Sequence, residues 1–260
     1  MTTPVGDLLA TQKNIIATAT TIDPAAGPAE PIRPVLDGTL IQYSLTSTFP
    51  SNLKNILLTT VKDEAGPAIY GAFTSPVPLQ YYNYVAALVF GAERAVQILA
   101  AYASIQDEID DIRPELVVVC TDGAWRCPNY SLARSWASRG GNVWVGEFTV
   151  GATYPTNDAI SFCTTNGTVC HQDDISIVFG TTISPTAAQT ALTAQVQARW
   201  AAFIKTGNPN TSGFGNWNQV THNGSVPVLN LGGTSPIPLG GCDPSLWGST
   251  IEYDYQIYGQ

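Results

Sequence analysis

Short apolar runs that lack polar–apolar alternation constrain the fold of this chain most. Residues 55–61 (Asn-Ile-Leu-Leu-Thr-Thr-Val) are apolar and β-branched, the pattern of a strand buried on both faces in a parallel sheet. Residues 116–120 form a second candidate for a buried strand, and residues 142–150 are interpreted as a third strand. A sheet with helices on both faces is therefore the first expectation.

Helical segments alternate with these runs. Residues 92–104, 129–139 and 186–205 carry apolar side chains at helical spacing, and the acidic segment 107–115 is expected to be a solvated helix end or loop. Strands that alternate with helices predict an α/β fold with a parallel sheet. Ligands of such sheets bind beyond the carboxyl ends of the strands, so the polar residues that follow each strand are the candidates for chemistry.

Composition excludes several classes of protein. The 260 residues are 44% apolar, which suffices for a sizeable core, and the net charge of −9 opposes binding to nucleic acids and to anionic lipids. No apolar run approaches the ~18 residues of a transmembrane helix. Charged residues make up only 12%, beside 23 Gly and 18 Pro, which favours a turn-rich secreted protein.

The five cysteines support an extracellular location. Cys120 and Cys127 are separated by six residues, and Cys163 and Cys170 repeat this spacing, which predicts two short disulfide loops. Four reduced core cysteines are the alternative, and a zinc site is disfavoured because zinc knuckles use shorter spacings. Cys242 is left over, either with a partner elsewhere or as a buried thiol.

Two further features concern secretion. Asn129, Asn166, Asn210 and Asn223 each begin an Asn-x-Ser/Thr sequon and are candidate glycosylation sites. Residues 1–13 lack the basic and apolar regions of a signal peptide, so the true start of the protein is expected to lie upstream.

Histidine chemistry is restricted to His171 and His222. His222 stands in a Gly- and Asn-containing segment and is expected to be an exposed loop residue. His171 follows Cys170 directly, so a tethered loop would hold it in place, as a general base requires; an ordinary loop histidine is the alternative. Asp63 and Glu64 follow the first predicted strand.

Residues around these side chains resemble a known family. Residues 60–66 (Thr-Val-Lys-Asp-Glu-Ala-Gly) and 171–180 (His-Gln-Asp-Asp-Ile, then Val-Phe-Gly) are similar to the acid and histidine segments of type-B carboxylesterases and cholinesterases, a family that includes fungal lipases. Residues 34–38, 121–128 and 200–210 agree with the family in the same order. Ala65 and Gln172 depart from its pattern.

The resemblance implies an α/β-hydrolase fold, with residues 1–260 as the C-terminal part of one catalytic domain. It implies that Glu64 is the acid and His171 the base of a Ser-His-Glu triad. Adjacent side chains at a strand end point to opposite sides, so only one of Asp63 and Glu64 is expected to face His171. The sequence contains no Gly-x-Ser-x-Gly, so the serine and oxyanion hole are expected on a complementary N-terminal chain.

The expected activity is hydrolysis of carboxylic esters or lipids by a secreted two-chain enzyme without metal or organic cofactor. A non-catalytic binding or adhesion protein of the same fold is the main alternative. A secreted carbohydrate-binding module is suggested only by the aromatic residues and the sequons, and the five motifs in family order argue against it.

Overall fold

The computed structural model describes residues 38–39, 52–103, 110–242 and 244–247. The chain divides into two compact units, residues 1–49 and 50–260, and every element below belongs to the second unit. The family-like segment 34–38 lies outside the described residues except for Gly38.

A parallel sheet forms the centre of the second unit. Its described strands are β1 (Ile56–Val61), β2 (Val143–Phe148) and β3 (Val228–Leu231), in the order β1-β2-β3. The register pairs Val61 with Phe148 and Phe148 with Leu231, so the carboxyl ends of all three strands meet at one edge. The strands expected at 55–61 and 142–150 are thus confirmed.

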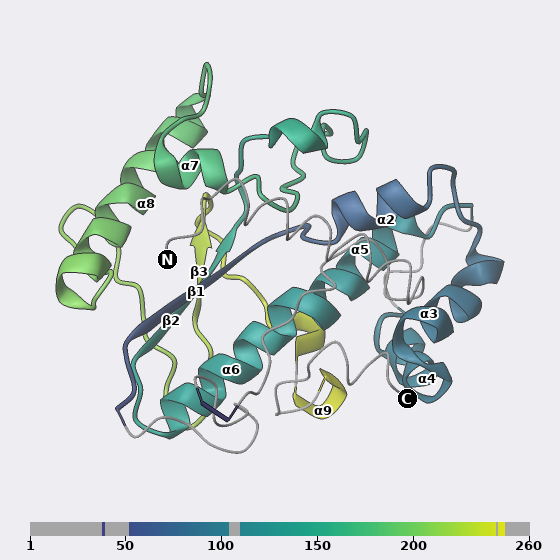
Figure 1. Ribbon diagram of the computed structural model, residues 1–260, viewed down its shortest axis with the longest axis horizontal. Coiled ribbons are helices and arrows are strands. Elements are labelled where there is room, and N and C mark those ends of the chain that lie inside the picture. Colours follow the sequence, from purple (N-terminus) through teal and green to yellow (C-terminus); the bar gives the residue numbers. More distant parts are fainter. Residues whose placement is uncertain (1–37, 40–51, 104–109, 243, 248–260) are drawn as a thin grey trace, which may run out of the picture. The chain divides into compact units, whose positions relative to one another are not determined.

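Helices cover both faces of this sheet (Figure 1). The helices of the described residues are α2 (Gly66–Ala72), η2 (Leu79–Tyr81), α3 (Tyr82–Phe90), α4 (Ala92–Ala101), α5 (Arg113–Thr121), η4 (Asp122–Arg126), α6 (Cys127–Ser138), η5 (Pro155–Asn157), α7 (Ile175–Phe179), α8 (Ala187–Thr206), η6 (Gly240–Cys242) and α9 (Pro244–Trp247). The helices expected at 92–104, 129–139 and 186–205 correspond to α4, α6 and α8. This arrangement confirms the α/β fold class.

Alternation along β2 explains why apolar residues occur on both of its faces. Val143 and Val145 pack into a core cluster with α5 and α6, whereas Trp144 and Phe148 pack into a second cluster with α7 and α8. Successive side chains of a strand point to opposite faces, so a sheet covered on both faces needs apolar residues at both sets of positions.

The strand expected at residues 116–120 is wrong, because these residues lie in helix α5. Pro114 lies in the first turn of α5, where its missing N–H costs no hydrogen bond. Leu116, Val117 and Val119 are each at most 1% exposed, so this helix is apolar on most of its circumference. Burial on several sides removes the 3.6-residue periodicity that distinguishes a helix from a buried strand. Of the acidic segment expected to be solvated, residues 107–109 lie outside the described residues and Asp110 is exposed, but Glu115 is buried in the first turn of α5.

Only one of the two expected disulfide loops forms. Cys163 bonds to Cys170, but Cys127 bonds to Cys242, and Cys120 is a buried free thiol whose pKa is raised to about 12 by burial. The elements α5, η4 and α6 follow one another without a break. Seven helical steps lead from Cys120 to Cys127, which places their Cα atoms about 10 Å apart along the axis. Disulfide-bonded Cα atoms are only about 4–7 Å apart, so this pairing is geometrically excluded.

Every helix of the described residues is too short or too polar to span a bilayer.

Candidate functional site

Glu64 and His171 meet at the carboxyl edge of the sheet. Glu64 follows the end of β1 and is 7% exposed, whereas the His171 side chain, in the loop after β2, is half exposed. The distance between Glu64 Oε2 and His171 Nδ1 is 2.6 Å, and Glu64 Oε1 accepts a hydrogen bond from the Val61 N–H at 2.9 Å. Because an ionised carboxylate can only accept, Nδ1 carries the proton, and Nε2 is the nitrogen suited to proton transfer.

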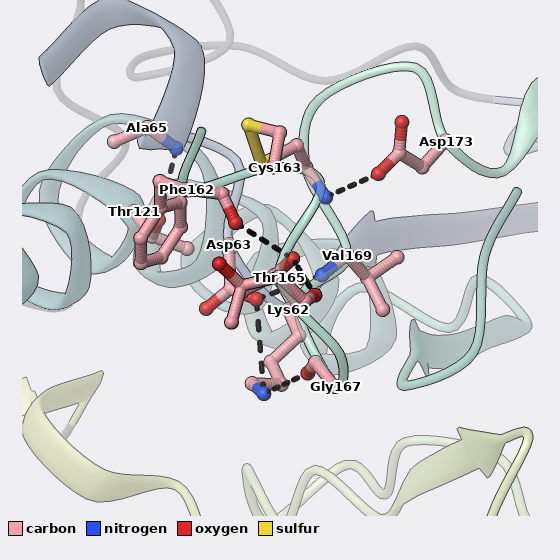
Figure 2. A network of polar contacts seen from close by, with 12 residues as sticks. Lys62, Asp63, Ala65, Thr121, Phe162, Cys163, Thr165, Gly167, Val169 and Asp173 are labelled. Carbon is pink, nitrogen blue, oxygen red and sulfur yellow. Dashed lines mark hydrogen bonds and ion pairs between the residues drawn. A yellow bond between two sulfur atoms is a disulfide. The ribbon is translucent and has the colours of Figure 1, made fainter. Parts of the chain in front are cut away.

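Asp63 faces a different part of the same loop. Its Oδ2 accepts a hydrogen bond from the Val169 N–H at 2.9 Å, and its own N–H donates to the Val169 carbonyl at 2.9 Å. Lys62 Nζ donates to the Gly167 carbonyl at 2.6 Å and lies 3.7 Å from Asp63 Oδ2. Figure 2 shows this network between the end of β1 and the disulfide loop. Of the two neighbouring carboxylates, therefore, Glu64 is the one that contacts His171.

Asp173 and Asn157 hold the backbone around His171. Asp173 accepts hydrogen bonds from the backbone N–H groups of Cys170 and Tyr154, and Asn157 Nδ2 donates both to Asp173 and to the His171 carbonyl at 2.9 Å. Burial raises the pKa of Asp173, and these donors oppose the shift. The loop thus holds the backbone of His171 from both directions, as a pre-organised base requires.

Gln172 explains one departure from the family pattern. Its φ is +75°, in the left-handed region that glycine adopts without strain. The family usually has glycine at this position, and glycine suits the observed backbone conformation. This chain adopts the same conformation with a glutamine.

The sequence suggested a helix cap or a buried polar contact for Asp122, but not the ionic cluster that it forms with Arg126 and Glu147. Arg126 Nη1 lies 2.7 Å from Asp122 Oδ1, Arg126 Nε lies 2.8 Å from Glu147 Oε2, and Arg126 Nη2 donates to the Lys62 carbonyl. Burial raises the pKa of both Asp122 and Glu147, whereas the Arg126 charge lowers them. Glu147 lies within an apolar strand, and such a charge in a buried run was the available signal for an internal partner.

Within the described residues, one group of potential metal ligands comprises Asp122, Cys127 and Cys242, with ligand atoms within 4.8 Å of one another. The two sulfur atoms are bonded to each other, so they cannot serve as thiolate ligands. This group does not fit a metal ion.

Of the remaining candidates, Asn166 lies in the disulfide loop that leads to His171, and the others belong to other segments of the chain. His222 is exposed, with Nδ1 2.6 Å from the Ala137 carbonyl oxygen. Asn166 and Asn223 are exposed, Asn129 lies in α6, and the Asn210 side chain binds the backbone of Trp217.

Known proteins resemble this chain in sequence and structure. Residues 2–236 match the carboxylesterase family. A stretch of 99 residues, 37% of the chain, is 34% identical to the "cAMP-regulated D2 protein" of Dictyostelium discoideum and covers 18% of that protein. A solved structure of "PNB esterase" has a TM-score of 0.48 and 20% identity, over 68% of this chain and 34% of that one. The chain thus spans about a third or less of the length of these relatives.

Proposed function

Because the chain belongs to the carboxylesterase family, we propose that it supplies the acid and the base of a serine ester hydrolase. His171 is the general base and Glu64 is the residue that orients it. The nucleophilic serine belongs to a complementary N-terminal chain. The observation that carries the proposal is the 2.6 Å contact between the buried Glu64 carboxylate and Nδ1 of the half-exposed His171.

Proton transfer through His171 accounts for both halves of the reaction. Nε2 takes the serine proton while the serine oxygen bonds to the ester carbonyl carbon, and the Glu64 carboxylate stabilises the imidazolium that forms. The imidazolium returns this proton to the leaving alkoxide, so an alcohol departs and an acyl-serine remains. A water molecule then repeats the sequence and releases the carboxylic acid. The substrate is a carboxylic ester or lipid, and the proton transfers need no metal or organic cofactor.

Secretion belongs to the same proposal. Two disulfides, Cys127–Cys242 and Cys163–Cys170, favour an oxidising compartment, and the sequons at Asn166 and Asn223 lie on exposed segments. A mass decrease on enzymatic deglycosylation of the natively purified protein would support this location.

The complementary chain can be sought directly. The natively purified protein is treated with a fluorophosphonate ester, which labels activated serines, and intact masses are measured before and after reduction. We expect a co-purifying polypeptide of roughly 25–35 kDa, the size of a missing half of such a domain, to carry the label. If neither partner nor label is found, the non-catalytic binding protein becomes the better interpretation.

A further inference from the structure

We infer that Asp63 is a positioning residue that anchors the loop carrying His171 to the end of β1 and thereby sets the contact between Glu64 and His171. The inference rests on the proposed function, because it assumes that this contact orients the base. Neither the family match nor the motif comparison assigns this role to Asp63.

Three consecutive residues of the acid segment bind three points of one loop. Lys62 binds the carbonyl of Gly167, Asp63 binds Val169, and Glu64 binds the ring of His171. Asp63 and Cys170 form an isolated parallel bridge, so the two segments lie side by side at this point. Movement of Val169 away from Asp63 would therefore carry His171 away from Glu64.

Of these three residues, Asp63 makes two hydrogen bonds to the loop. It binds both the N–H and the carbonyl of Val169, the first with its side chain and the second with its backbone. The Asp63 side chain is 10% exposed, whereas that of Lys62 is 43% exposed. A hydrogen bond to a buried carboxylate contributes more than a solvated ammonium contact.

Close packing beside Asp63 leaves little room for an alternative loop position. A Cβ atom at Gly66 would lie 2.8 Å from Cys170 Sγ, so the start of α2 contacts the disulfide directly. The disulfide spans the point that Asp63 anchors, with Cys163 before Val169 and Cys170 directly after it, and the Asp173 and Asn157 bonds hold the residues that follow. Asp63 joins this pre-formed loop to the strand that carries Glu64.

Two substitutions separate positioning from general stabilisation. Asp63→Asn keeps an oxygen acceptor for the Val169 N–H, whereas Asp63→Ala removes it and leaves the backbone bond intact. If Asp63→Ala does not fold, Asp63→Leu keeps the branched shape of the side chain, fills the space and likewise lacks an acceptor.

Side-chain NMR of ¹⁵N-histidine-labelled chain provides a test that needs neither the serine nor turnover. The chain has only two histidines, and the Nδ1–H of His222 serves as an internal reference. We expect the His171 Nδ1–H to exchange slowly with water in the wild type and in Asp63→Asn. In Asp63→Ala its exchange should accelerate at least ~10-fold, as in Glu64→Gln, with His222 unchanged.

Protection of the His171 Nδ1–H in a folded Asp63→Ala or Asp63→Leu variant, at the wild-type level, would overturn the inference. In the assembled enzyme, Asp63→Ala should lower kcat by ~10²-fold with little change in KM, and Asp63→Asn should restore it. Absence of a labelled serine partner would contradict the proposed function alone, because the NMR reading does not depend on that partner.

Discussion

At the scale of single residues, the carboxylate of Glu64 has a separate partner for each oxygen. Oε1 accepts from the Val61 N–H, and Oε2 contacts His171. Glu64→Gln keeps the shape of the side chain but removes the charge that stabilises the imidazolium. We expect kcat of the assembled enzyme to fall by ~10³–10⁴-fold, measured with a saturating soluble ester.

His222→Gln is the matched control for this change, because His222 is exposed and its ring contacts the Ala137 carbonyl in helix α6. It should leave kcat unchanged. If Asp63→Asn proves as damaging as Glu64→Gln is expected to be, while Glu64→Gln has little effect, the acid is Asp63 and the assignment of Glu64 is wrong.

The backbone of Gln172 leads to a prediction about stability. A side chain at φ +75° is strained, and glycine at this position relieves that strain. Gln172→Gly should raise the free energy of unfolding by about 1 kcal/mol in urea denaturation. Gln172→Ala is the control, because alanine retains the Cβ atom. Equal gains from both substitutions would show that the lost Gln side chain, rather than the backbone, is the cause.

At the scale of elements, the start of α2 is packed more tightly than its end. A Cβ atom at Gly66 would lie 2.8 Å from Cys170 Sγ and 3.0 Å from the Phe162 ring, whereas one at Gly71 would meet nothing within 4 Å. We expect Gly66→Ala to lower the free energy of unfolding by about 1–3 kcal/mol. Gly71→Ala in the same helix should be neutral or stabilising by up to about 1 kcal/mol.

Thermal and urea denaturation of the two alanine variants would check this prediction. A Gly66→Ala variant as stable as Gly71→Ala would mean that the disulfide loop does not press on α2 in solution.

The two disulfides should differ in what they stabilise. Cys127–Cys242 closes a sequence separation of 115, and Cys163–Cys170 one of 7. From loop entropy, paired alanine substitutions should cost about 5 and about 2.5 kcal/mol respectively. Only the loss of Cys163–Cys170 should also speed exchange of the His171 Nδ1–H, because that loop leads directly into His171. Similar NMR effects from both double variants would contradict this division.

Local sequence signals were sufficient for some elements only. Helix α8 begins at a capping box formed by Thr186 and Gln189 and ends at Gly207 with φ +74°, so both ends were encoded locally. The residue pattern of helix α5 does not distinguish it from a buried strand, because a helix and a strand that are buried on all sides both consist of apolar residues. The Cys127–Cys242 bond could not be predicted, since nothing near Cys127 in the sequence indicates a partner so distant.

In the molecule as a whole, the order of the motifs predicted the contact between Glu64 and His171 better than the local patterns did. Glu64 and His171 are 107 residues apart, and the parallel register brings the ends of β1 and β2 to the same edge. The rule that ligands bind beyond the carboxyl ends of parallel strands predicts this edge of the sheet, but it does not predict which side chains contact one another there. The role of Asp63 depends on a backbone-to-side-chain bond to Val169, and no residue pattern encodes such a bond.

The buried carboxyl groups determine how the stability of the fold changes when the pH is lowered. Burial raises the pKa of five carboxyl groups: Asp63, Asp122, Glu147, Asp173 and Asp174. A carboxyl group whose pKa is higher in the folded state binds protons more readily when folded. Its contribution to stability is fully present below the unfolded pKa and is lost as the pH rises through the folded pKa. Acidification from pH 7 to pH 5 therefore does not destabilise the fold through these groups.

Enzymatic activity, unlike stability, should fall when the pH is lowered from 7 to 5. His171 must be neutral to accept the serine proton, and histidine side chains gain a proton between pH 8 and pH 5. We expect kcat/KM of the assembled enzyme to fall by roughly tenfold or more between pH 7 and pH 5. The urea midpoint, measured by circular dichroism on the same samples, should not fall. A flat activity profile would count against a histidine base, and a parallel fall of activity and midpoint would indicate that acid unfolds the site instead of protonating it.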